Sequence, residues 1–226
     1  MHNKKLLARA AVVALLAGVG LGAQAQVAGT WFGGIGATKI KPNTSSGDLS
    51  APSAPGTKVD MGSDTQPTLF IGRMLTDNWS VEVPIGFGFE HDVNGAGAIQ
   101  GVGRIATVKV LPISVFAQYR FLEPQSRFRP YLLGGLTYAY FYGERGSATL
   151  NAVNPANPSG GTTLDTDSKF GWSLGLGVTA TITERWFLDL HYNRTWLKTT
   201  TTLNSGQHID TKLDPDVWVL SVGYRF

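Results

Sequence analysis

Apolar side chains alternate with polar or small ones along several long segments of the chain. Across residues 79–90 every odd position is apolar, and every even position is polar, Gly or Pro. The C-terminal segment repeats this pattern, and its apolar face is Trp218, Leu220, Val222, Tyr224 and Phe226. A period of two belongs to β-strands with two different surroundings, whereas an amphipathic helix repeats every 3.6 residues. Helical periodicity is absent after the N-terminal region, so the sequence predicts strands throughout.

Eight segments share the alternation, and each is longer than the roughly five or six residues usual for strands of soluble proteins. They span about 29–41, 58–76, 79–90, 106–122, 129–144, 167–183, 186–202 and 209–226. A tilted membrane crossing takes about 9–11 residues, so these segments fit crossings that extend beyond the bilayer. An even number of strands also permits closure with both termini on one side.

The connections between these segments alternate between short and long. The short ones are 76–78, 123–128 and 183–185, and the longer ones are 42–57, 91–105, 145–166 and 203–208. Lipid offers no partner for backbone N–H and C=O groups, so a sheet with a continuous apolar face must close on itself. The sequence therefore predicts an all-β fold, an eight-stranded antiparallel transmembrane β-barrel with short periplasmic turns and longer extracellular loops. A soluble β-sandwich, the alternative, is disfavoured because the six tryptophans crowd toward strand ends, as interfacial aromatic girdles do.

The first 25 residues have the pattern of a secretory signal peptide. Lys4, Lys5 and Arg9 precede an apolar run over 10–21, and Ala23-Gln24-Ala25 supplies small residues for cleavage. The run is shorter than the roughly 20 residues of a spanning helix. We therefore expect residues 1–25 to be a signal peptide and residues 26–226 to form one outer-membrane barrel domain.

The composition excludes several classes of function. The chain has 19 Lys/Arg and 16 Asp/Glu. Without the three basic residues of the signal, 16 Lys/Arg balance 16 Asp/Glu, and the rest of the chain is formally neutral. No basic cluster remains that could neutralise a row of phosphates, so nucleic-acid binding is not expected. The absence of cysteine from the sequence excludes disulfides, thiolate metal sites and a cysteine-linked lipid anchor. No cofactor is expected either.

Short sequence pieces resemble the outer membrane protein W (OmpW) family over essentially the whole chain after the signal. They are Trp31-Phe32-Gly33-Gly34-Ile35-Gly36, Pro67-Thr68-Leu69, Thr76-Asp77-Asn78-Trp79, Val83-Pro84-Ile85-Gly86-Phe87, Lys109-Val110-Leu111-Pro112, Gln118-Tyr119-Arg120-Phe121, Arg129-Pro130-Tyr131, Gly134-Gly135-Leu136-Thr137-Tyr138, Asp214-Pro215-Asp216-Val217-Trp218 and Gly223-Tyr224-Arg225-Phe226. Their order and spacing carry the resemblance. The family's His near the end of the third strand is kept as His91, whereas the long external loops match poorly.

This resemblance implies a function in transport. It implies a narrow, largely hydrophobic barrel, porin-like in role, that lets small hydrophobic compounds cross the outer membrane passively and leave sideways into the membrane; relatives include alkane-uptake proteins. A structural or adhesive barrel whose extracellular loops bind partners is the alternative. The expected location is the bacterial outer membrane. Expected partners are outer-membrane lipids and lipopolysaccharide, small hydrophobic solutes and, transiently, the barrel-assembly machinery, because the terminal strand ending in Phe226 resembles its recognition signal.

The predicted inward faces divide into an apolar set and a polar set. The apolar set, a candidate hydrophobic lumen, is Phe32, Ile40, Phe70, Met74, Phe116, Phe141 and Phe187. These side chains either line a path for apolar solutes or simply fill the barrel, since eight strands leave an interior that side chains nearly fill. The polar set is Glu82, Gln118, Arg120, Asp189, His191, Asn193 and Arg225. A lone buried ion is costly, so we expect internal ion pairs that plug the periplasmic half.

Catalytic and metal-binding hypotheses are weaker. Asp189 stands two residues from His191 on the same face and could orient an imidazole, but the serine would have to be chosen freely, for example Ser173 or Ser221. The chain is therefore not expected to be an enzyme. His91 and His208 lie at external strand ends, where two solvated imidazoles are more common than a metal site.

Overall fold

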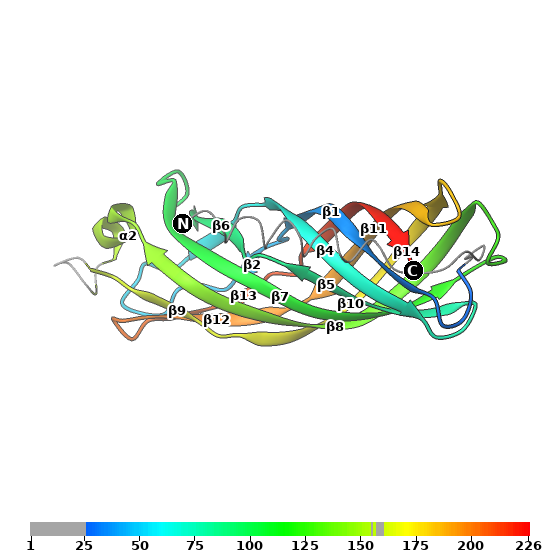
Figure 1. Ribbon diagram of the computed structural model, residues 1–226. Helices are drawn as coiled ribbons and strands as arrows, with labels where there is room; N and C mark the ends of the chain where they lie inside the picture. Colours follow the sequence, from blue (N-terminus) through cyan, green and yellow to red (C-terminus); the bar gives the residue numbers. More distant parts are fainter. Residues whose placement is uncertain (1–25, 155, 157–160) are drawn as a thin grey trace, which may run out of the picture.

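The computed structural model describes residues 26–154, 156 and 161–226, so the predicted signal peptide lies outside the described residues. Eight long antiparallel strands form the barrel (Figure 1): β1 (Trp31–Lys41), β4 (Asp64–Met74), β5 (Trp79–Gly86), β7 (Arg104–Arg120), β8 (Phe128–Gly146), β10 (Lys169–Thr181), β11 (Trp186–Trp196) and β14 (Asp216–Arg225). The order is β7-β5-β4-β1-β14-β11-β10-β8, and β8 pairs back onto β7. The predicted eight-stranded antiparallel barrel is confirmed.

One end of the barrel continues into what we call the external extension, at the opposite end from the C-terminus (Figure 1). It consists of β2 (Ser45–Ser46), β3 (Thr57–Met61), β6 (Phe89–Gly97), α2 (Ala148–Val153), β9 (Leu164–Thr166), β12 (Lys198–Leu203) and β13 (His208–Lys212). Strands β3 and β6 lengthen the wall along β7, and β2-β13-β12-β9 form a separate sheet. The short turns lie at the end of the barrel that holds the C-terminus, so this end faces the periplasm.

Four of the eight predicted strands are each divided into two strands in the structure. The segments 58–76, 79–90, 186–202 and 209–226 are each interrupted, at residues 62–63, 87–88, 197 and 213–215. The predicted loop 91–105 is also too long, because β6 runs on to residue 97. The six-residue helix α2, capped by the Ser147 side chain, was missed because so short a helix leaves no measurable periodicity.

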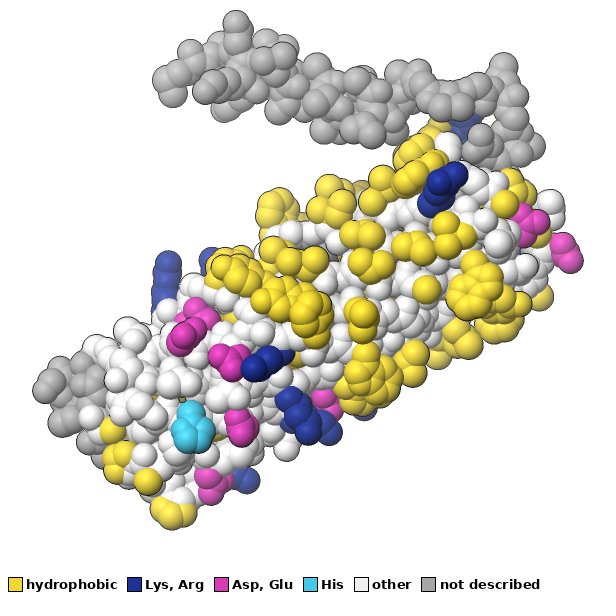
Figure 2. Space-filling view, turned by 90° about the horizontal axis from the view of Figure 1, so that it is seen from below, with side chains coloured by type: hydrophobic (Ala, Val, Ile, Leu, Met, Phe, Trp, Pro, Cys, Tyr) yellow, Lys and Arg dark blue, Asp and Glu magenta, His cyan; other side chains and the backbone are white. Residues whose placement is uncertain are grey.

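A band of exposed apolar side chains surrounds the barrel. Leu176 and Leu220 are 59% and 58% exposed, and Figure 2 shows hydrophobic side chains gathered over part of the molecule, with most charged ones toward one end. Trp186 and Trp79 mark the periplasmic limit of this band, and the stacked rings of Trp172 and Trp196 mark its external side. Among the described helices, none has the length and apolar character needed to cross a bilayer.

The alternation of faces breaks after β5. Phe87 points outward and is 73% exposed, whereas Phe89 is buried with 1% exposure, although both share one parity in the sequence. Residues 87–88 lie outside the ladder and separate β5 from β6. A Cβ atom on Gly88 would lie 2.0 Å from the Tyr142 hydroxyl oxygen, so the Tyr142 side chain would have to move to accept a larger residue there. The odd-numbered apolar residues of 79–90 therefore do not form one continuous face, as the alternation predicts.

Two interior aromatic rings lie over glycines of the neighbouring strand. Phe32 pairs with Gly72, and Phe187 pairs with Gly223. A Cβ atom on either glycine would come within 2.1–2.3 Å of the facing ring. The missing side chains therefore provide the space that these rings occupy in the narrow interior.

Candidate functional site

The interior near the periplasmic end is filled by aromatic rings. Phe32, Phe70 and Phe187 meet with ring centroids 6.2–6.4 Å apart, and Met74 packs with them. Edge-to-face packing at such distances is favourable beyond the apolar area buried. This cluster leaves little free space at its level.

Arg120 lies at the centre of the polar side chains above that cluster. Its guanidinium donates to Thr179 Oγ1 and Gln118 Oε1, each at 2.6 Å, and to Ser80 Oγ at 3.3 Å. The same group lies 4.7 Å from the Tyr131 ring centroid, within the range of a cation–π contact. Four barrel strands, β5, β7, β8 and β10, thus meet at one buried arginine.

Asp189 continues this network across the barrel. Its carboxylate accepts hydrogen bonds from the Tyr131 hydroxyl at 2.8 Å and the Thr179 hydroxyl at 2.9 Å, and it contacts His191 Nδ1 at 3.2 Å. We call this set the polar layer: Ser80, Gln118, Arg120, Tyr131, Thr179, Asp189 and His191. Glu82 is buried beside it and lines the same cavity as Asp189 and His191.

The structure places all seven predicted polar side chains in the interior, but with different partners from those expected. Asn193 lies beyond the layer, 3.5 Å from the Thr195 hydroxyl. Arg225 donates to Thr181 Oγ1 and to the Glu184 carbonyl oxygen. Of the predicted internal ion pairs, the described residues show the contact between Asp189 and His191, whereas neither Arg120 nor Arg225 lies within 4.0 Å of a carboxylate there. Hydroxyl, amide and carbonyl oxygens accept from these arginines, and Nε of Arg225 has no partner among the described residues.

Arg129 was missed by the sequence reasoning. This side chain is fully buried, and it donates to the carbonyl oxygens of Gln26, Asp77, Phe121 and Leu122 and to the Gln26 side chain. It therefore ties two periplasmic turns and the segment before β1 together. The sequence did hold a sign of this position: Arg129 lies two residues before Tyr131 on the same strand, so both side chains point to the same face.

A cavity of about 110 Å³, here called the lower cavity, lies above the polar layer. Ile40, Phe70, Phe116 and Phe141 of the predicted lumen line it. Phe32, Met74 and Phe187 do not, because they belong to the aromatic cluster below. The apolar set thus divides: four members line free space, three pack in the cluster below, and Phe70 contacts both. That the first group forms a path for solutes remains a prediction.

The barrel wall is interrupted beside the lower cavity. Strand β5 pairs with β7 only up to Glu82 opposite Phe116, and pairing resumes with Phe89 of β6 opposite Val110. Residues 83–88 and 111–115 therefore have no ladder partners across this seam, and we call the gap the wall opening. The cavity is lined here by the half-exposed to exposed side chains of Leu69, Phe87 and Leu111, so it reaches the outer surface. Pro84 and Pro112 flank the opening and have no N–H to leave unpaired.

A second cavity, of about 80 Å³, lies inside the external extension and is here called the upper cavity. Most of its lining is aliphatic, including Val59, Val108 and Leu164. Met61 and Leu213 line both cavities, so the two adjoin at these side chains. Two largely apolar cavities therefore adjoin between the extension and the wall opening, and the polar layer lies beneath them.

His91 of β6 lines the lower cavity, outside the membrane-spanning part of the wall. It is 1% exposed, and its Nδ1 lies 2.7 Å from the Gly62 carbonyl oxygen. Burial lowers the pKa of His91 below its usual value, although the Gly62 carbonyl and the nearby Asp64 carboxylate oppose this effect. The folded state therefore favours the neutral imidazole.

Lowering the pH from 7.5 to 5.5 is expected to reduce the free energy of unfolding through His91. Because its folded pKa is depressed, this contribution is complete above the unfolded pKa of about 6.5 and is lost as the pH falls below it. Urea unfolding followed by circular dichroism measures the change. The variant His91→Gln should lack this component, whereas His208→Gln, at an exposed position, should keep it; equal pH dependence in both variants would contradict the assignment.

The remaining chemical hypotheses find little support in the geometry. The Ser173 hydroxyl lies 2.8 Å from the Thr195 hydroxyl and 3.4 Å from that of Thr137, in a row of hydroxyl groups rather than against His191. Among the described residues no group of three or more metal-ligating side chains occurs. The expectations that the chain is not an enzyme and holds no metal remain predictions.

Comparison with known proteins connects this architecture to a family. Residues 28–226 match the OmpW family. Outer membrane protein W of Escherichia coli strain K12 is 32% identical over 234 residues, covering 99% of this chain and 100% of that protein. The crystal structure of OprG from Pseudomonas aeruginosa superposes with a TM-score of 0.80 at 26% identity, covering 90% of this chain and 99% of that one. The solid-state NMR structure of AlkL in lipid bilayers shares the fold, with a TM-score of 0.68 at 21% identity and coverage of 92% and 94%.

Proposed function

The chain belongs to the OmpW family of outer-membrane β-barrels, and from this premise we propose that it is a passive uptake route for small hydrophobic compounds. Solute enters the external extension, passes Met61 and Leu213 into the lower cavity, and leaves through the wall opening into the hydrocarbon of the bilayer. The observation that carries this proposal is the lower cavity itself, which is apolar and reaches the lipid-facing surface beside Leu69 and Phe87.

The polar layer supports a sideways exit over a straight passage to the periplasm. An apolar solute moving past Arg120 would have to displace hydrogen-bond partners in a buried site, and each unsatisfied buried group costs on the order of 1–3 kcal/mol. The aromatic cluster of Phe32, Phe70 and Phe187 fills the space beneath. By contrast, the wall opening offers apolar side chains on both sides.

The cavity sizes indicate the class of solute. Benzene occupies an engineered apolar cavity of about 150 Å³ in another protein, so chambers of this size suit one small ring or a short alkyl chain at a time. Most of the surface that the lining presents to the cavity is apolar, although polar side chains such as Glu82, Asp189 and His191 also reach it. We therefore infer weak selectivity among apolar compounds of similar width.

Uptake by cells tests the proposal. Cells that produce the protein should accumulate octane or naphthalene faster than cells without it, because the lipopolysaccharide layer otherwise limits the flux. The variant Ala139→Phe places a phenyl ring in the lower cavity, and its uptake should fall to near that of cells without the protein. The control Ala37→Phe adds the same ring at an outward position and should keep wild-type uptake. Disrupting the outer membrane with a chelator should abolish all differences.

A second pair of variants tests the wall opening. Leu111→Asp places a carboxylate beside the exit, and displacing its water should slow flux about tenfold, the factor that corresponds to 1.4 kcal/mol. Leu132→Asp places the same charge on the lipid face of β8, away from the opening, and should leave flux unchanged. Equal flux in both variants would exclude the sideways exit. Equal uptake with and without the wild-type protein would exclude transport altogether and favour a structural or adhesive barrel.

A further inference from the structure

We propose that the outer face of the barrel binds the phosphate groups of lipid A, the anchor of lipopolysaccharide, in a groove formed by Lys169, Lys198 and Lys212. Ser45, three threonines and Asp210, whose carboxylate accepts from the Thr200 hydroxyl at 2.6 Å, also line this surface, which we call the lysine groove. It lies on the external extension just beyond the apolar band, apart from the route proposed for solutes.

The depth of the lysine groove in the membrane follows from the aromatic rings beside it. Trp172 and Trp196 stack with centroids 3.9 Å apart, at the external side of the apolar band. Tryptophan rings favour the membrane interface, where headgroups begin. Lys169 lies three residues from Trp172 and Lys198 lies two residues from Trp196, each on the side away from the periplasm. Their amines therefore stand at headgroup depth in the outer leaflet.

The register of the external sheet places two of the lysines together. Lys198 of β12 is the direct cross-strand partner of Lys212 of β13, so both side chains emerge on the same face. Like charges in such a pair destabilise a sheet unless something neutralises them. A phosphate between the two amines would relieve this repulsion.

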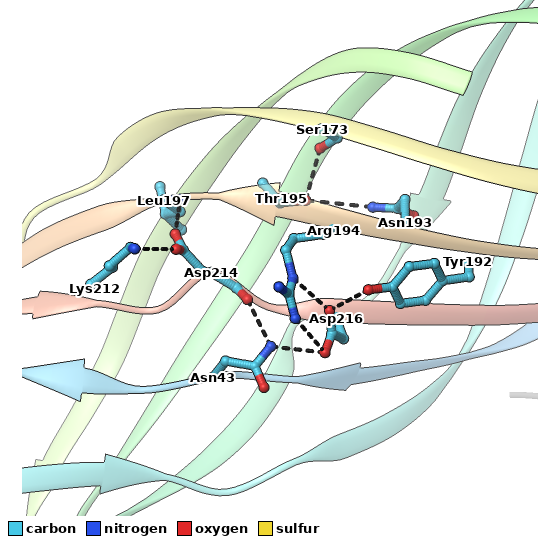
Figure 3. A network of polar contacts seen from close by, with 10 residues as sticks. All are labelled: Asn43, Ser173, Tyr192, Asn193, Arg194, Thr195, Leu197, Lys212, Asp214 and Asp216. Carbon is cyan, nitrogen blue, oxygen red and sulfur yellow. Dashed lines mark hydrogen bonds and ion pairs between the residues drawn. The ribbon is translucent and has the colours of Figure 1, made fainter. Parts of the chain in front are cut away.

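Two of the three lysine amines contact a carboxylate in the described part of the chain, and the third does not. Within the described residues, no carboxylate lies within 4.0 Å of Lys198. The pair of Lys169 with Asp167, at 3.0 Å, is half exposed on both sides, and such pairs contribute little and exchange readily. Lys212 contacts Asp214 at 3.0 Å, and the Asp214 carboxylate also accepts the Leu197 N–H, so its charge is shared (Figure 3).

The surroundings favour a lipid phosphate over a free anion. The groove is broad, and it adjoins an apolar surface with two large rings, which acyl chains can cover. Basic groups next to a membrane surface bind anionic headgroups, with about a fivefold gain in affinity for each Lys or Arg. Three lysines should therefore contribute on the order of 100-fold to lipid A binding.

Calorimetric titration of the folded full-length protein in neutral detergent micelles tests this site, with diphosphorylated lipid A as the probe. The triple variant Lys169→Ala, Lys198→Ala, Lys212→Ala should bind on the order of 100-fold more weakly. The triple lysine-to-arginine variant should retain binding, which separates loss of charge from loss of folding. As a matched control, Lys58→Ala, Arg104→Ala, Lys109→Ala removes three other exposed cations, one from β3 of the extension and two from the external end of β7, and should change affinity less than fivefold.

Titrations with two other ligands distinguish lipid phosphate from free phosphate. Lipid A without its phosphates should bind as weakly to the wild type as lipid A does to the triple alanine variant. Inorganic phosphate alone should not saturate the site at the lipid concentrations used. Equal loss in the two triple alanine variants, undiminished binding of dephosphorylated lipid A, or saturation by inorganic phosphate would each overturn the proposal.

Discussion

Replacing Asp189 with alanine is expected to destabilise the folded barrel by about 3–5 kcal/mol, the range found when one partner of a buried charged pair is removed. The Asp189 carboxylate accepts from Tyr131 and Thr179 and contacts His191, and all of these groups are buried. Its loss leaves three polar groups without their acceptor in a site that water reaches poorly. Urea unfolding in lipid bilayers, followed by tryptophan fluorescence, measures the change in free energy.

Two variants make this test specific to the hydrogen bonds. Asp189→Asn keeps the shape but offers one accepting oxygen in place of two, so it should lose less stability than alanine. Ser221→Ala alters the cross-strand neighbour of Asp189, a buried side chain with no side-chain hydrogen bond in the described part of the chain. That change should stay within about 0.5 kcal/mol. A loss at Ser221 as large as that at Asp189 would assign the effect to packing.

The second large effect is expected at Gly223. An alanine there would put its Cβ atom 2.1 Å from Cζ of Phe187, and overpacking of this kind costs about 1–3 kcal/mol. Gly134→Ala is the matched control, because its nearest neighbour is a flexible Leu174 methyl group at 3.4 Å. There the removal of glycine's conformational freedom should leave stability unchanged or slightly raised. Adding Phe187→Leu to Gly223→Ala should restore much of the loss, and failure of that rescue would contradict steric crowding as the cause.

The barrel itself could be predicted from the sequence because lipid and lumen impose opposite preferences on alternate residues. Leu176 and Leu220 face outward and Phe141 faces inward, as their parity requires. Odd or even position fails to predict the direction of a side chain only where the backbone pairing between strands is interrupted. At residues 87–88 two residues leave the sheet, and Phe89 changes sides without any change in the pattern of residue types.

The polar layer shows a second limit of the sequence reasoning. Alternation predicts that Arg120 points inward, but it gives no information about which of eight strands lies opposite at that height. The partners of Arg120 come from β5, β7 and β10, at sequence separations of up to 59 residues. Thr179 and Ser80 have no charge, so a search for ion pairs passes over them.

The wall opening could not be predicted either, because it is a property of register. Two prolines, Pro84 and Pro112, were visible in predicted strands, and proline is tolerated in a sheet where a ladder bond is absent. Only the pairing of β5 and β6 with β7 shows that both belong to one gap beside one cavity. The seven predicted lumen residues divide for a similar reason, since parity sets direction but not height along the barrel.

The seam between β1 and β14 joins the two ends of the barrel domain, from Phe32 opposite Arg225 to Lys41 opposite Asp216. Above it, Asn43 donates to Asp216, 173 residues further along the chain. Asp216 also accepts from Tyr192 and Arg194 (Figure 3). A pairing this distant is the slowest to form, because almost the whole chain must be in place first. Until it forms, two strands present bare edges that hydrocarbon cannot satisfy. Insertion into the bilayer and closure of the cylinder must therefore occur as one coupled event, which the first and last strands complete.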